Sequence, residues 1–245
     1  MQLDELCHFC DDYLSVDEFE DYCPNGLQVE GTPQVNRLVS GVTASLELIE
    51  AAIDQDADAI LVHHGYFWNG EAQPLVGYKG NRIRRLMQHD INLLAYHLPL
   101  DAHPTVGNNA QLAQRMGWLV TGQEGLLWTG ELGQSCAVDQ VLDELGERID
   151  CNPLLIYGGE HKVHRLAWCT GAAQSYIEKA AGLGVDLFIS GEISEQTVHV
   201  AREAGIHYIA AGHHATERYG VQALGELLAN RFSIHHEYIE IDNPV

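Results

Sequence analysis

Three short segments hold most of the side chains in this sequence that could bind a metal ion. They are His-His at 63–64, His-Leu-Pro-Leu-Asp at 97–101 and His-His-Ala-Thr-Glu at 213–217. Each follows directly on an apolar run typical of a buried strand, and open α/β sheets bind their ligands at the carboxyl ends of strands. Imidazole and carboxylate groups suit Zn, Fe or Mn, and no thiolate marks a closed structural zinc site here. The three segments therefore predict a metal site, with more than one ion.

The two histidine pairs leave alternatives open. Neighbouring residues on a strand point to opposite faces, so His63 and His64 bind the same ion only if the strand ends there, which Gly65 allows. Otherwise each binds a different ion of a pair, with a carboxylate bridging the two ions. In the second pair, spacing alone does not decide whether His213 or His214 faces inward.

Two further residues are candidates for proton transfer. We expect His97 to orient a ligand or to donate a proton rather than to bind metal. Pro99 argues against a helix at this point, so the loop must fold back to present both His97 and Asp101. Glu192 could be a ligand, an acid–base group or the cap of a helix that begins near position 194.

These segments are placed by an α/β pattern that occurs twice. Short apolar runs and amphipathic stretches alternate as strand, helix, strand, helix, strand over residues 37–102 and again over 165–217. Strands that are apolar throughout indicate a sheet covered by helices on both faces. The fold class is therefore α/β, with duplicated, pseudo-symmetric lobes. Equivalent strand ends in the two lobes could meet at a cleft that holds the metal site.

The chain is long enough for two such lobes. We expect a first lobe over residues 1–117, a short connecting segment or small insert over 118–160, and a second lobe over 161–245, joined as one unit. A CxxC pair at Cys7 and Cys10 falls in a predicted helix, which favours packing over redox chemistry. The aromatic loop at 66–70 could stack on a ring of the substrate or form an apolar lid.

Composition restricts the partners. The formal net charge of −22 repels nucleic-acid phosphates, so nucleic-acid binding is disfavoured. No apolar run reaches the length of a membrane span, and the cysteines are too few and scattered for a disulfide scaffold, so we expect a cytoplasmic protein with no membrane association.

Four segments together resemble the Nif-three-like family, often labelled GTP cyclohydrolase I type 2 homologues. The resemblance runs nearly from end to end, on residues 62–68, 96–101, 190–192 and 212–218, and includes residues 21–29. It implies a duplicated α/β fold, a toroidal homohexamer and a dinuclear metal centre between the lobes. The metal ligands that it implies, with His213 in preference to His214, are His63, His64, Asp101, His213 and Glu217.

The chemistry of such a centre predicts the function. We expect a metal-dependent hydrolase with two divalent ions per subunit (Zn, Fe or Mn), acting on a small nucleotide-like or phosphorylated substrate, with His97 or Glu192 moving protons. One alternative is a ring opening like that of GTP cyclohydrolase I type 2. Another is a non-enzymatic, ring-shaped scaffold that metal stabilises.

Overall fold

The computed structural model describes residues 1–245, and the chain divides into two compact units. The first comprises Met1–Val106 and Gly220–Asp242, and the second comprises Gly107–Tyr219 and Asn243–Val245. Helix α9 (His213–Phe232) contributes residues to both units, because their boundary falls between Tyr219 and Gly220. No helix has both the length and the apolar character that crossing a bilayer requires.

The first unit is built on a five-stranded sheet in the order β1-β4-β3-β2-β11. Strand β1 runs antiparallel to β4, and the remaining pairs are parallel. The strands are β1 (Gly26–Val29), β2 (Arg37–Thr43), β3 (Ala59–His64), β4 (Asn92–Ala95) and β11 (His235–Tyr238).

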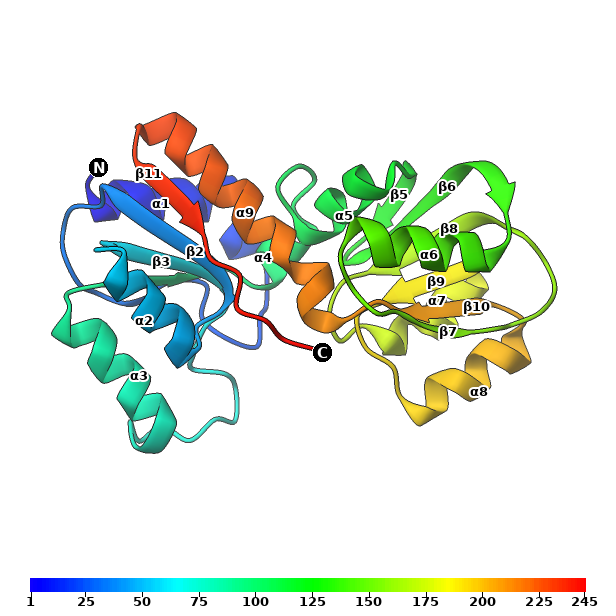
Figure 1. Ribbon diagram of the computed structural model, residues 1–245, viewed down its shortest axis with the longest axis horizontal. Helices are drawn as coiled ribbons and strands as arrows, with labels where there is room; N and C mark the ends of the chain where they lie inside the picture. The colour runs from blue at the N-terminus through cyan, green and yellow to red at the C-terminus, as the bar shows by residue number, and fades with distance from the viewer. The chain divides into compact units, whose positions relative to one another are not determined.

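Helices cover both faces of this sheet (Figure 1). Apolar residues of α2 (Leu46–Asp54) and α3 (Gly77–Gln88) pack on one face. Those of α1 (Leu3–Tyr13) and of the later turns of α9 pack on the other. The central strands β2, β3 and β4 are buried on both faces, as their continuous apolar runs predict. The unit also contains η1 (Val16–Glu18) and α4 (Leu98–Ala102).

The second unit has a six-stranded sheet in the order β5-β6-β8-β9-β10-β7, again between two helical layers (Figure 1). Helices α5 and α6 pack on one face, and α7 and α8 pack on the other. The strands are β5 (Leu119–Glu124), β6 (Leu127–Cys136), β7 (Leu154–Ile156), β8 (Val163–Cys169), β9 (Leu187–Ser190) and β10 (His207–Ala210). The helices are α5 (Asn108–Met116), α6 (Val138–Arg148), η2 (Gln174–Tyr176), α7 (Ile177–Gly182) and α8 (Glu195–Ala204).

The strand pairing repeats between the units. In the first, β2 pairs in parallel with β3 and β3 with β4; in the second, β8 pairs in parallel with β9 and β9 with β10. An antiparallel strand then flanks the third strand of each set, β1 beside β4 and β7 beside β10. The structure thus confirms a mixed α/β fold with two sheets. It also extends the repeat back to β1 and β7, which the sequence pattern did not include.

One aspartate fixes the first two parallel strands in each unit. The Oδ2 atom of Asp58 accepts hydrogen bonds from the backbone N–H groups of Asn36 and Arg37, at 2.8 and 2.9 Å. The Oδ2 atom of Asp186 accepts the same pair of bonds, from residues 164 and 165, at 2.9 and 2.8 Å. Each aspartate directly precedes the middle strand of its set. The repeat therefore includes side-chain anchors as well as strands.

The boundaries of the two units differ from the predicted boundaries, which lie after residues 117 and 160. Segment 118–160 is not a separate insert: β5, β6 and β7 belong to the second sheet, and Val141 and Leu145 of α6 pack in its core. Conversely, residues 220–242 belong to the first unit, because Val221, Leu224 and Leu228 of α9 pack against its sheet.

Candidate metal centre

In the first unit, two candidate ligands lie at the carboxyl end of β3. His63 is fully buried, and its Nδ1 atom donates a hydrogen bond of 2.9 Å to the carbonyl oxygen of Tyr96. A carbonyl only accepts, so the proton of a neutral His63 is on Nδ1 and the lone pair is on Nε2. His64 Nδ1 is hydrogen-bonded to the hydroxyl of Thr43 at 3.1 Å. The strand ends at His64, and the two imidazole rings lie 4.6 Å apart.

Glycine is required directly after this pair. A Cβ atom on Gly65 would lie 2.2 Å from Oε1 of Gln28 and 2.6 Å from Cβ of Ala95. The chain therefore turns away from the strand through a space that holds backbone only. The side-chain amide of Gln28 also accepts a 2.7 Å hydrogen bond from the N–H group of Tyr66, which fixes the start of the aromatic loop.

His97 lies beside this pair and is held by a buried aspartate. Its Nδ1 atom is 2.7 Å from Oδ1 of Asp21, and the side chains are only 13% and 3% exposed. Three ring nitrogens lie within 4.8 Å of one another here, one each from His63, His64 and His97. The ring of Trp68 packs edge-on against His97, with centroids 4.9 Å apart. This part of the aromatic loop thus packs against the histidine cluster.

Asp21 is the best-anchored acid of the first unit. Burial would raise the pKa of its carboxyl, but hydrogen bonds from His97 and Asn25, the electrostatic interaction with His97 and the N–H group of Leu98 lower it to about 2. The side-chain N–H of Asn25 donates a hydrogen bond of 2.9 Å to Oδ2 of Asp21. The side-chain oxygen of Asn25 accepts a hydrogen bond of 2.7 Å from the backbone N–H of His97. Asp21 is therefore ionised and rigidly placed at neutral pH.

Asp101 is presented by a helix, which corrects the predicted loop. Residues Leu98–Ala102 form α4, with His97 as its N-cap and Pro99 in its first turn. Proline fits there because the first N–H groups of a helix have no partner within it. The buried Asp101 places Oδ1 3.5 Å from Nε2 of His63. The short helix α4, in place of a folded-back loop, thus presents both His97 and Asp101.

In the second unit, His213 and Glu217 lie one turn apart at the start of α9. Glu217 is almost fully buried, and its Oε2 atom lies 2.9 Å from Nε2 of His213. The other ring nitrogen, Nδ1, lies 2.8 Å from Oε1 of Glu192. Burial would lower the pKa of His213, but the hydrogen bonds and charges of Glu217 and Glu192 raise it to about 9.

The second unit leaves little room around these side chains. A Cβ atom on Gly171, which has φ +69°, would lie 1.9 Å from Oε1 of Glu217. The backbone of His214 is held by a 2.8 Å hydrogen bond from its N–H to the carbonyl of Val245. Glu192 is not the cap of the next helix, because Ser194 occupies the N-cap of α8.

The side chains present fit divalent metal ions. His63 has a fixed tautomer with its lone pair on Nε2, next to a buried carboxylate, and three imidazoles are grouped within the first unit. The second unit adds an imidazole between two carboxylates. Such nitrogen and oxygen donors suit Zn, Fe or Mn, and His213 must give up a proton to become a ligand.

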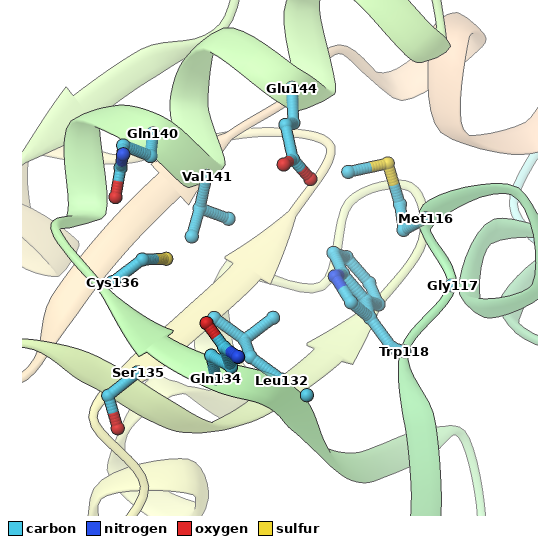
Figure 2. Close-up of a pocket in the computed structure, with 11 residues that line it drawn as sticks. Met116, Gly117, Trp118, Leu132, Gln134, Ser135, Cys136, Gln140, Val141 and Glu144 are labelled. Atoms are coloured by element: carbon cyan, nitrogen blue, oxygen red, sulfur yellow. The ribbon is translucent and has the colours of Figure 1, made fainter.

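A pocket elsewhere in the second unit lacks this chemistry. It has a volume of about 410 Å³ and is bordered by the end of α5, by β6 and by α6 (Figure 2). The Glu144 carboxylate and the Cys136 thiol lie on its walls (Figure 2). Burial and the charge of Glu144 raise the pKa of the Cys136 thiol. The pocket contains none of the candidate ligands and no group of three metal-binding side chains.

This chain matches known proteins in sequence and in fold. The profile of Duf34/NIF3 (NGG1p interacting factor 3) matches residues 1–244. The chain belongs to this family. A relative from Allochromatium vinosum, called GTP cyclohydrolase 1 type 2 homolog, is 55% identical over 98% of this chain and 96% of its own. A protein of the same name from Escherichia coli is 48% identical over the full length of both. The solved structure of protein ybgI, described as of unknown function, has a TM-score of 0.97 at 48% identity and covers 100% of both chains.

Family membership confirms the resemblance drawn from the sequence, but the site contains residues that sequence analysis did not single out. Asp21 and Asn25 hold His97, and Thr43 holds His64. Asp21 lies 76 positions before its partner, so no local spacing relates the two. Its segment stood out only as part of the family motif over residues 21–29.

Proposed function

We propose that this Duf34/NIF3 protein is a metal-dependent hydrolase with a dinuclear divalent-metal centre. The ligands would be His63, His64 and Asp101 of the first unit with His213 and Glu217 of the second. The observation that carries the proposal is the pairing of oriented imidazoles with buried carboxylates at strand ends in both units. When bound, the ions would polarise the bond to be cleaved and make water a stronger nucleophile at neutral pH.

The chain's own residues would orient the centre and move protons. The backbone carbonyl of Tyr96 and the hydroxyl of Thr43 keep His63 and His64 in place. Glu192 holds His213 through one carboxylate oxygen. Its side chain is 34% exposed, so its second oxygen can exchange protons with substrate and solvent. We therefore assign proton transfer to Glu192 in preference to the more deeply held His97.

The substrate class follows from the chemistry of the centre. Pairs of divalent ions serve best where negative charge develops on oxygen, as in the hydrolysis of phosphate esters and anhydrides. The chain's net charge of −22 makes a small substrate, nucleotide-like or phosphorylated, a better fit than a nucleic acid. Trp68, next to His97, offers an aromatic surface on which a base could stack.

Metal analysis followed by an activity panel tests the proposal. Protein purified without chelator or affinity histidines should contain about two ions per chain and should release phosphate or pyrophosphate from members of a nucleotide and phosphoester panel. His64→Ala should lower metal content and abolish turnover, whereas His199→Ala, an exposed histidine on α8, should change neither. Less than about one ion per chain after reloading would contradict the dinuclear centre.

The name of the relatives supports a second candidate, ring opening of GTP as in GTP cyclohydrolases. This reaction releases formate, so a formate assay with GTP separates it from the preferred hydrolysis. A scaffold that metal stabilises is the non-enzymatic alternative. In that case, variants of the ligands would keep the biological function whenever they keep the assembly.

We also propose that the chain forms a homohexameric toroid, as the family resemblance implied. Light scattering should then give a mass of about six times 27.1 kDa, and a monomer or dimer would contradict the toroid.

A further inference from the structure

Lys79 is the only lysine or arginine that the fold buries, with 6% of the residue exposed. Its ammonium lies 2.9 Å from Oε2 of Glu71, 3.4 Å from the carbonyl oxygen of Ala72 and 4.9 Å from the ring centroid of Phe67. Lys79 is in the first turn of α3, where the helix dipole disfavours a positive charge. A buried ion pair is often no better for stability than apolar residues of similar size. Stability alone therefore does not account for this lysine.

Glu71 connects Lys79 to the aromatic loop at 66–70. The same oxygen, Oε2 of Glu71, accepts hydrogen bonds from the backbone N–H groups of Phe67 and Trp68, at 3.0 and 3.2 Å. The hydrogen bond from Lys79 outweighs burial and lowers the pKa of the Glu71 carboxyl, so this acceptor is ionised at neutral pH. Phe67 has φ +65°, a conformation that is strained for a bulky side chain and persists only where the surroundings hold it. The ion pair therefore holds the aromatic loop in a strained shape.

The aromatic loop in this shape places Trp68 beside His97. The two ring centroids lie 4.9 Å apart, and the indole N–H donates a hydrogen bond of 3.2 Å to the carbonyl oxygen of Gly65. The ring of Tyr22, which is 63% exposed, lies 6.3 Å from His97. The backbone N–H of Asn69 donates a hydrogen bond of 2.7 Å to the carbonyl oxygen of Tyr22, so the two aromatic segments are joined. Two aromatic rings from linked segments thus lie next to the same histidine.

We infer that the ion pair of Glu71 and Lys79 holds Trp68 as one wall of a subsite for the aromatic base of a nucleotide. Trp68 would contact the base, and Glu71 and Lys79 are positioning residues. This inference rests on the proposed function, because the phosphate of the nucleotide would bind at the metal centre. It goes beyond that function by selecting nucleotides over other phosphorylated molecules. Every base has a face that stacks on an indole ring, so the subsite recognises the presence of a base.

Two probes that differ only in the base test the subsite. They are the phosphonate analogues of adenosine monophosphate and of ribose phosphate, in which a methylene group replaces the bridging oxygen so that neither can be hydrolysed. Calorimetric titration of the zinc-loaded, full-length protein would measure both affinities. We expect wild type to bind the adenosine probe about tenfold tighter, or more, than the ribose probe. Trp68→Leu should remove this advantage and leave the affinity for the ribose probe unchanged.

A pair of double variants tests the positioning role. Glu71→Ala/Lys79→Met removes both charges, so no unpaired charge is left buried and the protein should fold. Phe67 and Trp68 lose their acceptor, and the advantage of the adenosine probe should fall to within about twofold. Glu71→Gln/Lys79→Met differs only in keeping an amide oxygen that can accept both N–H groups. It should restore an advantage of about threefold or more.

A matched control lies on the same helix. Arg85→Met breaks the more exposed ion pair of Arg85 with Glu50, in which the two closest atoms are 2.6 Å apart, and it should leave both affinities as in wild type. Metal content should be that of wild type in every variant of this series, since none of the substituted residues is a proposed ligand.

The outcomes separate the inference from the proposed function. Metal analysis of wild type decides the dinuclear centre, whatever the probes do. If metal-loaded wild type binds the two probes equally, or does not bind the adenosine probe, only the inference is overturned. An undiminished advantage in Trp68→Leu would overturn the base subsite. An undiminished advantage in Glu71→Ala/Lys79→Met, or an equal loss in both double variants, would overturn the positioning role of the ion pair.

Discussion

Hydrogen bonds with residues at the ends of strands decide which atom His63 and His64 can offer. His63 is oriented by a backbone carbonyl, which no substitution removes, whereas His64 depends on the hydroxyl of Thr43. Thr43 and His64 are paired across β2 and β3, so this contact is fixed by the register of the sheet. A change of one side chain can therefore loosen one ligand while the strand stays in place.

Thr43→Val tests this dependence. Valine has the shape of threonine and suits a strand, but it leaves Nδ1 of His64 without the hydroxyl. We expect metal affinity to fall about tenfold, with the free energy of unfolding of the metal-free protein changed by less than about 1 kcal/mol. Titration with Co²⁺ and urea unfolding would measure the two effects. Thr121→Val in β5, whose hydroxyl bonds only to Thr129, is the matched control and should bind metal as wild type does.

Among the helices and strands, the repeat is clearest at the aspartate that directly precedes the middle strand of each parallel set. Asp58 and Asp186 each accept two backbone N–H groups from the start of the adjacent strand, and each donates its own N–H to that strand, to Arg37 and Arg165. The carboxylates satisfy N–H groups that would otherwise lack a partner, and they fix the register of the parallel pair.

Asp58→Ala and Asp186→Ala should therefore cost similar amounts of stability. Losing two hydrogen bonds to a charged acceptor should lower the free energy of unfolding by about 2 kcal/mol in each case. Calorimetry or urea unfolding would measure the loss. Asp54→Ala, at the exposed end of α2, should stay within about 0.5 kcal/mol of wild type. A loss at only one of the two aspartates would show that the two anchors are not equivalent.

Long, regular elements could be predicted from the sequence, and short or distant ones could not. Apolar runs and helical spacing predict the alternating strands and helices over residues 37–102 and 165–217, and the structure has them there, from β2 to β4 and from β8 to β10. Strand β7 has only three residues, too few for a pattern, and pairs with β10 some fifty positions later. Pro99 argues against a helix in the sequence pattern, but it lies in the first turn of α4, where proline is tolerated. The candidate ligands stood out by residue type, but Asp21 and Thr43 reach them only through the fold.

For the molecule as a whole, two effects oppose each other as the pH falls. The net charge of −22 decreases as carboxylates take up protons, which relieves repulsion in the folded chain. Partly buried histidines act in the opposite direction, because a histidine that resists protonation in the fold lowers the stability of the protein as the pH falls. The clearest case is His236 on β11, which is hydrogen-bonded through Nε2 to the buried Ser40 at 2.8 Å and lies against Gly225 of α9.

His236 should therefore make the protein less stable in mild acid. Burial, and secondly the charge of His235, lower its pKa from 6.5 to about 4. As the pH falls through 6.5 the unfolded chain takes up a proton, whereas the folded chain does so only near pH 4. The contribution of His236 to the free energy of unfolding is thus fully present above pH 6.5 and is lost as the pH falls from 6.5 to 4. The loss is about 2 kcal/mol after allowance for partial screening by solvent. The expected result in urea unfolding across this range is that His236→Gln, which retains a bond to Ser40 but does not titrate, shows a smaller loss than wild type. Identical profiles for the two proteins would mean that His236 ionises as readily in the fold as out of it, and that the general charge of the chain alone sets its response to pH.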